Sequence, residues 1–155
     1  MAKYIVDLQT ENHEKYYFIR EQESQDIVLL PSKYLMHKKR SRLSPNTIRR
    51  SAGAISYYLN YLDETGTKLE DVWEMKYDKQ QEHFTDYLIW LQAGLHSGDN
   101  NKQKPCNETC NAYLKEVFRF YRYAGQQGET IKQLKVLSDM RIIVNNSVGV
   151  KRTLY

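Results

Sequence analysis

The sequence has few cysteines and no long apolar run. Its two cysteines, Cys106 and Cys110, lie four residues apart in KPCNETC, and its four histidines are scattered along the chain. We therefore expect two reduced thiols and no zinc site, because zinc requires a tighter cluster of ligands. No segment approaches the roughly 20 apolar residues that span a bilayer, and the first residues lack the apolar stretch of a signal peptide. These absences predict a cytoplasmic protein without a membrane partner.

Motifs that mark common catalytic sites are also missing. The chain has no glycine-rich phosphate loop, no HExxH and no GxSxG. The acidic residues of segment 63–99 show no paired arrangement that would support catalysis, and Tyr155 is interpreted as the end of the chain rather than a nucleophile. We expect no catalytic residue, no metal site and no cofactor in this chain.

Acidic residues are absent from one long window, residues 27–62, which carries seven Lys and Arg side chains. The segments on either side of it, 1–26 and 63–99, have net charges of −3 and −6, and segment 100–155 has a net charge of +6. Charge blocks of this size indicate one basic face and one acidic face. A basic face indicates nucleic acid or an acidic surface as the partner.

Residues 1–30 are predicted to form a short β arm. The segments YIVDL (4–8) and YYFIR (16–20) are rich in β-branched and aromatic residues, and polar QTENHEK separates them. An isolated hairpin is only marginally stable in water, so we expect this arm to pack on another part of the chain.

Residues 31–127 are predicted to form a helical domain. Pro31 is suited to start a short helix over 31–41, and Ser44 to cap a longer one that has Pro45 in its first turn and stops at Gly66. Further long helices are expected from Asp78 to Leu95 and from about residue 107 to 124, with a short one over 129–138. Each of the three long helices has apolar residues at helical spacing. These are Ile48, Ala52, Ile55, Leu59 and Leu62 in the first helix, Phe84, Leu88, Leu91 and Leu95 in the second, and Cys110, Leu114, Val117, Tyr121 and Ala124 in the third. Such faces must be buried against one another, so the predicted fold class is all-α, a compact bundle of about four helices with an N-terminal β arm.

Two groups of polar residues are candidates for contact with DNA. The first lies in the acid-free window, at and before the start of the capped helix, and the second forms a stripe on the third long helix. Lys and Arg beside helix N-termini bind backbone phosphates, and Asn and Arg also read base edges. The candidate DNA-binding residues are Lys38, Lys39, Arg40, Arg42, Thr47, Arg49, Arg50, Asn111, Lys115, Arg119 and Arg122.

Three segments resemble, in order, the three helices of one known domain. LSPNTIRRSAGAISYYLNYL (43–62), HFTDYLIWLQ (83–92) and NETCNAYLKEVFRFYRYA (107–124) are similar to the helices of the core-binding domain of phage-integrase-type tyrosine recombinases. The matching positions are Ser44, Thr47, Ile55, Tyr58 and Leu62 in the first helix, and Thr109, Asn111, Leu114, Phe120 and Tyr121 in the third. Ser51 and Ala112 depart from the Tyr and the basic residue that are usual in the family. The N-terminal arm resembles that of integrases from mobile genetic elements, and the likeness covers about residues 27–125.

The resemblance implies a SAM-like helical fold that forms one jaw of a DNA clamp in DNA integration and recombination. Its implied partners are double-stranded DNA, at an attachment or recombination site, and other recombinase protomers through the full-length protein. In the family, a second jaw carries the residues that cut and rejoin DNA strands, and residues 126–155 are too few to form it. We therefore expect residues 128–155 to be a short helix and the start of a linker to an absent catalytic domain, and the chain alone not to be an enzyme.

Two other interpretations remain open from the sequence. The charged stripe is also the ordinary solvated face of an amphipathic helix, so the bundle could be a protein-interaction module that docks its basic face on an acidic partner. A small stand-alone nuclease would need a cluster of metal-binding carboxylates, and none shows at a recognisable spacing.

Overall fold

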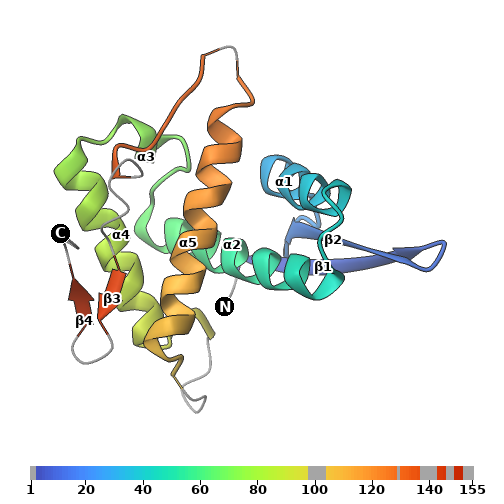
Figure 1. Cartoon of the computed structure of the whole chain (residues 1–155), viewed down its shortest axis with the longest axis horizontal. Helices are drawn as coiled ribbons and strands as arrows, with labels where there is room; N and C mark the ends of the chain where they lie inside the picture. Colours follow the sequence, from blue (N-terminus) through green and yellow to red (C-terminus); the bar gives the residue numbers. More distant parts are fainter. Residues whose placement is uncertain (1–2, 98–103, 129, 137–142, 146–148, 152–155) are drawn as a thin grey trace.

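The computed structural model describes residues 3–97, 104–128, 130–136, 143–145 and 149–151. Within these residues the chain is mostly helical, with a short antiparallel hairpin at its N-terminal end (Figure 1). The elements are β1 Tyr4–Glu11, β2 Glu14–Glu21, α1 Leu29–Arg40, α2 Pro45–Thr65, α3 Asp71–Glu74, α4 Tyr77–Gln92, the 3-10 turn η1 Leu95–Ser97, α5 Asn107–Gly125, β3 Ile143–Asn145 and β4 Gly149–Lys151. None of the helices in the described ranges has the length and hydropathy needed to traverse a lipid bilayer.

The predicted hairpin is present, but its strands are longer than the sequence indicated. β1 and β2 pair in antiparallel register from Tyr4 opposite Glu21 to Glu11 opposite Glu14. The turn consists of Asn12 and His13 alone, with φ of 51° and 67°. Two successive residues with positive φ match the tight turn whose twist suits a hairpin, so most of the polar stretch expected as a loop continues the strands.

The hairpin packs on α1 and α2. This was expected, because an isolated hairpin is only marginally stable in water. The Ser32 hydroxyl of α1 accepts a hydrogen bond from the backbone N–H of Ile19 (3.1 Å). The Asn60 side chain of α2 accepts bonds from the N–H groups of Lys3 (3.0 Å) and Tyr4 (2.9 Å) and donates one to the Tyr4 carbonyl (3.2 Å). These polar contacts and the burial of Ile19 fix the arm against the helices.

The ends of α2 follow the predicted capping chemistry. The Ser44 hydroxyl accepts a hydrogen bond from the Thr47 N–H (3.2 Å), which satisfies one of the free donors of the first turn. Gly66 ends the helix in the left-handed conformation with φ of 68°, and its N–H donates to the carbonyl of Asp63 (3.2 Å). α1 begins two residues earlier than expected, so Pro31 lies within its first turn, where it costs no intrahelical bond.

One core joins α2, α4 and α5. α5 crosses α2, with the hairpin and α1 on one side of the crossing and α4 on the other (Figure 1). The apolar positions predicted on α2 and α5 are all buried. The prediction for α4 is confirmed for Phe84, Leu88 and Leu91 and wrong for Leu95, which is 56% exposed. The cause is that α4 already ends at Gln92 and Gly94, with φ of 76°, redirects the chain.

The short helix predicted over 129–138 is wrong for residues 130–134. Residues 130–134 have no helical conformation, and the backbone N–H groups of Lys135 and Val136 donate to the side-chain oxygen of Gln80 (2.8 and 3.3 Å). Gln80 is fully buried in α4, and Leu134 and Val136 are buried beside it. Bonds to α4 therefore replace the bonds of the expected helix. Residues 129, 137 and 138 lie outside the described residues.

Candidate nucleic-acid interface

Basic side chains gather where α1 ends and α2 begins. The last turn of α1 holds His37, Lys38, Lys39 and Arg40, and no acidic residue occurs in the first turn of α2. The short connection between the helices passes through Arg42, which adopts a positive φ of 63°. Cations at a helix C-terminus stabilise its free carbonyl groups, so the local charge pattern also supports the fold. We call this region, together with the facing side of α5, the basic end of the molecule.

A first hollow separates the start of α2 from α5. Its volume is about 380 Å³, and we call it the α2 hollow. The predicted residues Thr47, Arg50 and Arg119 line it, along with Thr109 and Glu116 of α5. Hydroxyl groups and guanidinium groups are donors that suit phosphate oxygens.

A second hollow lies between the end of α1 and the C-terminal half of α5. Its volume is about 540 Å³, and we call it the α1 hollow. Four predicted residues line it, Lys38, Arg40, Arg119 and Arg122. Arg119 belongs to both hollows and so forms the wall between them. The structure thus brings together cations from α1, α2 and α5, which are distant in sequence.

Glu116 lies beneath this wall and holds two of the predicted cations. Its carboxylate is 3.1 Å from the Lys38 ammonium and 3.2 Å from the Arg119 guanidinium, and it accepts a 2.6 Å hydrogen bond from the Tyr34 hydroxyl. Burial and this bond raise the pKa of Tyr34 well above its ordinary value. The side chains of Lys38 and Glu116 are only 12% and 9% exposed, whereas that of Arg119 is 63% exposed. Lys38 is therefore enclosed with its counter-ion, and Arg119 still faces solvent.

Lys39 is paired as well. Its ammonium contacts the Glu14 carboxylate at the tip of the hairpin and lies 5.3 Å from the centre of the Tyr16 ring. The arm therefore neutralises one of the cations that the sequence assigned to DNA.

Most of the other predicted residues are exposed cations without an ion pair among the described residues. Within the described part of the chain, no ion pair involves Arg40, Arg42, Arg49, Arg50, Lys115 or Arg122, all of which are exposed. Arg49 donates to the side-chain oxygen of Asn46 (3.1 Å). Residues that line neither hollow are Lys39, Arg42, Arg49, Asn111 and Lys115, and Asn111 is half-buried.

The sequence did not identify Glu116 or Tyr34 as parts of this surface. Glu116 is one of only two acidic residues in α5, and it lies inside the basic stripe between Lys115 and Arg119. An isolated acid within such a stripe was the available signal. Its burial depends on how α1 packs against α5, which sequence spacing does not specify.

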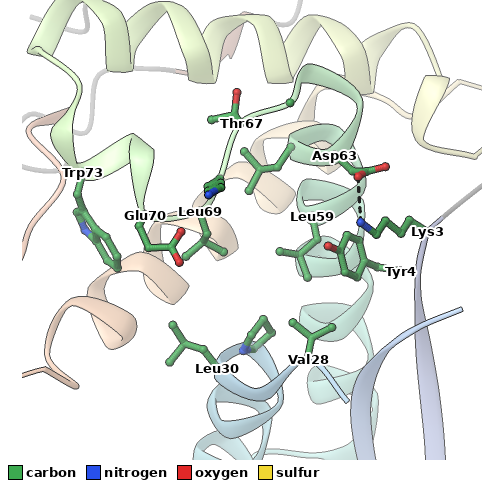
Figure 2. A pocket seen from close by; sticks show the side chains of 14 residues that line it. Lys3, Tyr4, Val28, Leu30, Leu59, Asp63, Thr67, Leu69, Glu70 and Trp73 are labelled. Carbon is green, nitrogen blue, oxygen red and sulfur yellow. Dashed lines mark hydrogen bonds and ion pairs between the residues drawn. The ribbon is translucent and has the colours of Figure 1, made fainter. Parts of the chain in front are cut away.

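A larger hollow of about 630 Å³ lies at the other end of α2, and Figure 2 shows it from close by. Apolar side chains of the hairpin–α1 connection, α2 and α3 face it, among them Val28, Leu59 and Trp73. The Lys3 ammonium and the Asp63 carboxylate form an ion pair of 3.3 Å at its rim. None of the predicted DNA-binding residues lines this hollow.

No group of three or more His, Cys, Asp or Glu side chains that could hold a metal occurs among the residues the structure describes. Cys106 and Cys110 are free, the first exposed and the second buried. Comparison of the chain with protein-family models gave no match, and neither did comparison with curated proteins or with solved structures.

Proposed function

We propose that the chain is a DNA-binding module that binds double-stranded DNA with its basic end. The observation that carries this proposal is the convergence of unpaired Arg side chains from three helices on two adjoining hollows. Arg40 comes from α1, Arg50 from α2 and Arg122 from α5, and Arg119 separates the hollows. An ordinary solvated face mixes charges of both signs, whereas here the acid that lines the α2 hollow, Glu116, is largely buried.

The geometry suits contacts with a phosphate backbone. Six exposed cations of α1, α2, α5 and the α1–α2 connection have no ion pair among the described residues, and Ser44 caps the N-terminus of α2. A helix N-terminus adds backbone donors and a positive partial charge to such a site. Phosphate contacts of this kind position a protein on DNA, and side chains in the grooves then read the bases.

The finer proposal is that this module is the core-binding domain, with a SAM-like fold, of a phage-integrase-type tyrosine recombinase. Its support is the ordered resemblance of the three long helices together with the Ser44 cap and the exposed Thr47 at the start of α2. In this proposal the chain forms one jaw of the DNA clamp, and a separate catalytic domain of the longer protein cuts and rejoins the strands.

A His-x-x-Arg motif occurs in α1. His37 and Arg40 have the His-x-x-Arg spacing that the family uses in its catalytic domain. Here the pair lies in α1, before the first of the three similar helices, and the His37 ring packs against the ring of Tyr123 with centroids 5.0 Å apart. We assign neither residue a catalytic role.

The test is fluorescence anisotropy of the chain on random duplex DNA across a salt series. Five or six neutralised phosphates at about −0.9 each predict a log–log slope of about −4 to −6. Arg50→Gln should reduce the magnitude of this slope by about 0.9 and weaken binding similarly on every sequence. Lys68→Gln is the matched control, because Lys68 is an exposed cation that lines the hollow at the other end of α2.

Undetectable binding at low salt would contradict the proposal, and so would equal losses from Arg50→Gln and Lys68→Gln. If the protein instead bound heparin tightly and duplex DNA not at all, the alternative of docking on an acidic protein partner would replace it.

A further inference from the structure

We propose that Glu116 is a positioning residue that withholds Lys38 from DNA and fixes Arg119 between the two hollows. This inference rests on the proposed function for the identity of the ligand. It concerns a residue whose charge opposes DNA binding, in the middle of the surface that is proposed to bind DNA. A carboxylate there repels phosphate, so its presence requires a reason beyond charge.

Glu116 and Tyr34 enclose Lys38. The Lys38 ammonium lies 3.1 Å from one carboxylate oxygen of Glu116, and its side chain is 12% exposed. The same oxygen accepts the Tyr34 hydroxyl, and the ammonium also lies 5.2 Å from the centre of the Tyr34 ring. A lysine paired with a protein carboxylate neutralises no phosphate, so it would release no counter-ion from the DNA.

Arg119 is bound by the same carboxylate but remains at the surface. Its guanidinium uses one nitrogen, 3.2 Å from the other carboxylate oxygen of Glu116. A guanidinium has five N–H donors in a rigid plane, so donors remain for a ligand in either hollow. Because Arg119 is 63% exposed and lines both hollows, the bond to Glu116 orients it without removing it from the surface.

The consequence is a division of roles among the cations. Glu116 joins α1 to α5 through Lys38 and Tyr34, and it presents Arg119 in one orientation. The free cations Arg40, Arg50 and Arg122 then provide the salt-dependent affinity. Lys38 contributes to the shape of the surface and not to its counter-ion release.

A double-mutant cycle of Glu116→Gln and Lys38→Met tests this division. Each protein is measured by anisotropy on random duplex DNA across a salt series, and by the salt concentration at which it leaves a heparin column. We expect Lys38→Met alone to leave the slope unchanged, and Glu116→Gln to steepen it by at least about 0.9, one phosphate. In the Glu116→Gln background, Lys38→Met should then reduce the slope by about 0.9. This non-additivity is the signature that a purely structural role would not produce.

Two control variants separate charge from packing. Glu64→Gln makes the same change in net charge at the far end of α2, where Glu64 is exposed, and should leave the slope unchanged. Tyr34→Phe removes the hydrogen bond to Glu116 without changing charge, and should lower the melting temperature but not the slope. If Glu116→Gln does not fold, Lys38→Met decides the question alone: an unchanged slope supports the inference, and a loss of about 0.9 overturns it.

The heparin column distinguishes failure of this inference from failure of the proposed function. If the unmodified protein does not bind DNA, the proposed function is wrong, but withholding of Lys38 still predicts the same non-additive pattern in elution from heparin. If Lys38→Met lowers the elution salt equally in both backgrounds, Lys38 is available in the unmodified protein and the inference is wrong.

Discussion

At the scale of single residues, a buried polar network links the three long helices. The Tyr58 hydroxyl of α2 is 2.9 Å from the Nε2 atom of His83 in α4 and 2.8 Å from the Tyr121 hydroxyl of α5. Tyr121 in turn donates to the carbonyl of Leu69 (3.0 Å). All three side chains are buried, so each polar group needs a partner, and breaking one bond leaves another group unsatisfied.

This network predicts a loss of stability in mild acid. Burial lowers the pKa of His83 from 6.5 to about 4. The folded protein therefore keeps His83 neutral while the unfolded chain takes up a proton as the pH falls below about 6.5. The stability contributed by the neutral imidazole is complete above this pH and is lost between about pH 6.5 and pH 4, to a total of about 3 kcal/mol.

The measurement is urea unfolding of the protein and of His83→Gln at several pH values from 7 to 4. Gln retains a partner for Tyr58 but does not titrate, so the difference in unfolding free energy between the two proteins should shrink by about 3 kcal/mol over this range. A difference that stays constant with pH would show that His83 is not the titrating group.

The candidate site shows how far sequence reasoning reached at this scale. The acid-free window and the charged stripe contain the cations that line the two hollows, but spacing along one helix does not show which residues of different helices meet. The sequence did not predict that Lys38 and Lys39 are paired. Their partners, Glu116 and Glu14, are far away in the chain and depend on how α5 and the hairpin pack against α1.

At the scale of elements, the N-terminus of α2 has both a structural and a proposed functional role. Ser44→Ala removes the cap and should lower the free energy of unfolding by about 1 kcal/mol. Ser44→Asp keeps a capping oxygen and should retain most of the stability, yet it adds a negative charge where DNA phosphates are proposed to lie. We therefore expect Ser44→Asp to weaken DNA binding more than Ser44→Ala does.

Thermal melts and anisotropy at one salt concentration check both expectations. A Ser44→Asp variant that binds DNA as tightly as the unmodified protein would place the phosphates away from the start of α2.

The elements also show which local signals were sufficient. The cap at Ser44, the stop at Gly66 and the apolar spacing predicted α2 closely, since each signal acts within one helix. The extent of β1 and β2 was underestimated because a turn made by Asn12 and His13 has a weaker signature than one that contains glycine. Residues 130–134 are not helical as expected, and the backbone of the next two residues is bound by Gln80, more than 50 residues earlier in the chain.

At the scale of the whole molecule, the surfaces at the two ends of α2 differ in charge and in the residues that line their hollows. The two hollows of the basic end are lined by unpaired Arg side chains, whereas the hollow at the other end has none of the predicted cations and has one ion pair at its rim. The proposed DNA interface therefore lies at one end of α2, and residues at the other end, such as Lys68, serve as control positions for mutagenesis.

The measurement that tests the central claim most directly is a titration of the isotope-labelled protein with a short duplex DNA, followed by backbone NMR. At 18.4 kDa the chain is well suited to this experiment. Binding through the basic end predicts changes in backbone amide chemical shift at the end of α1, in the first turns of α2 and on the exposed face of α5. These changes should become smaller as salt is added. Shifts centred on residues around the apolar hollow, such as Leu69 and Trp73, or no shifts at low salt, would contradict it.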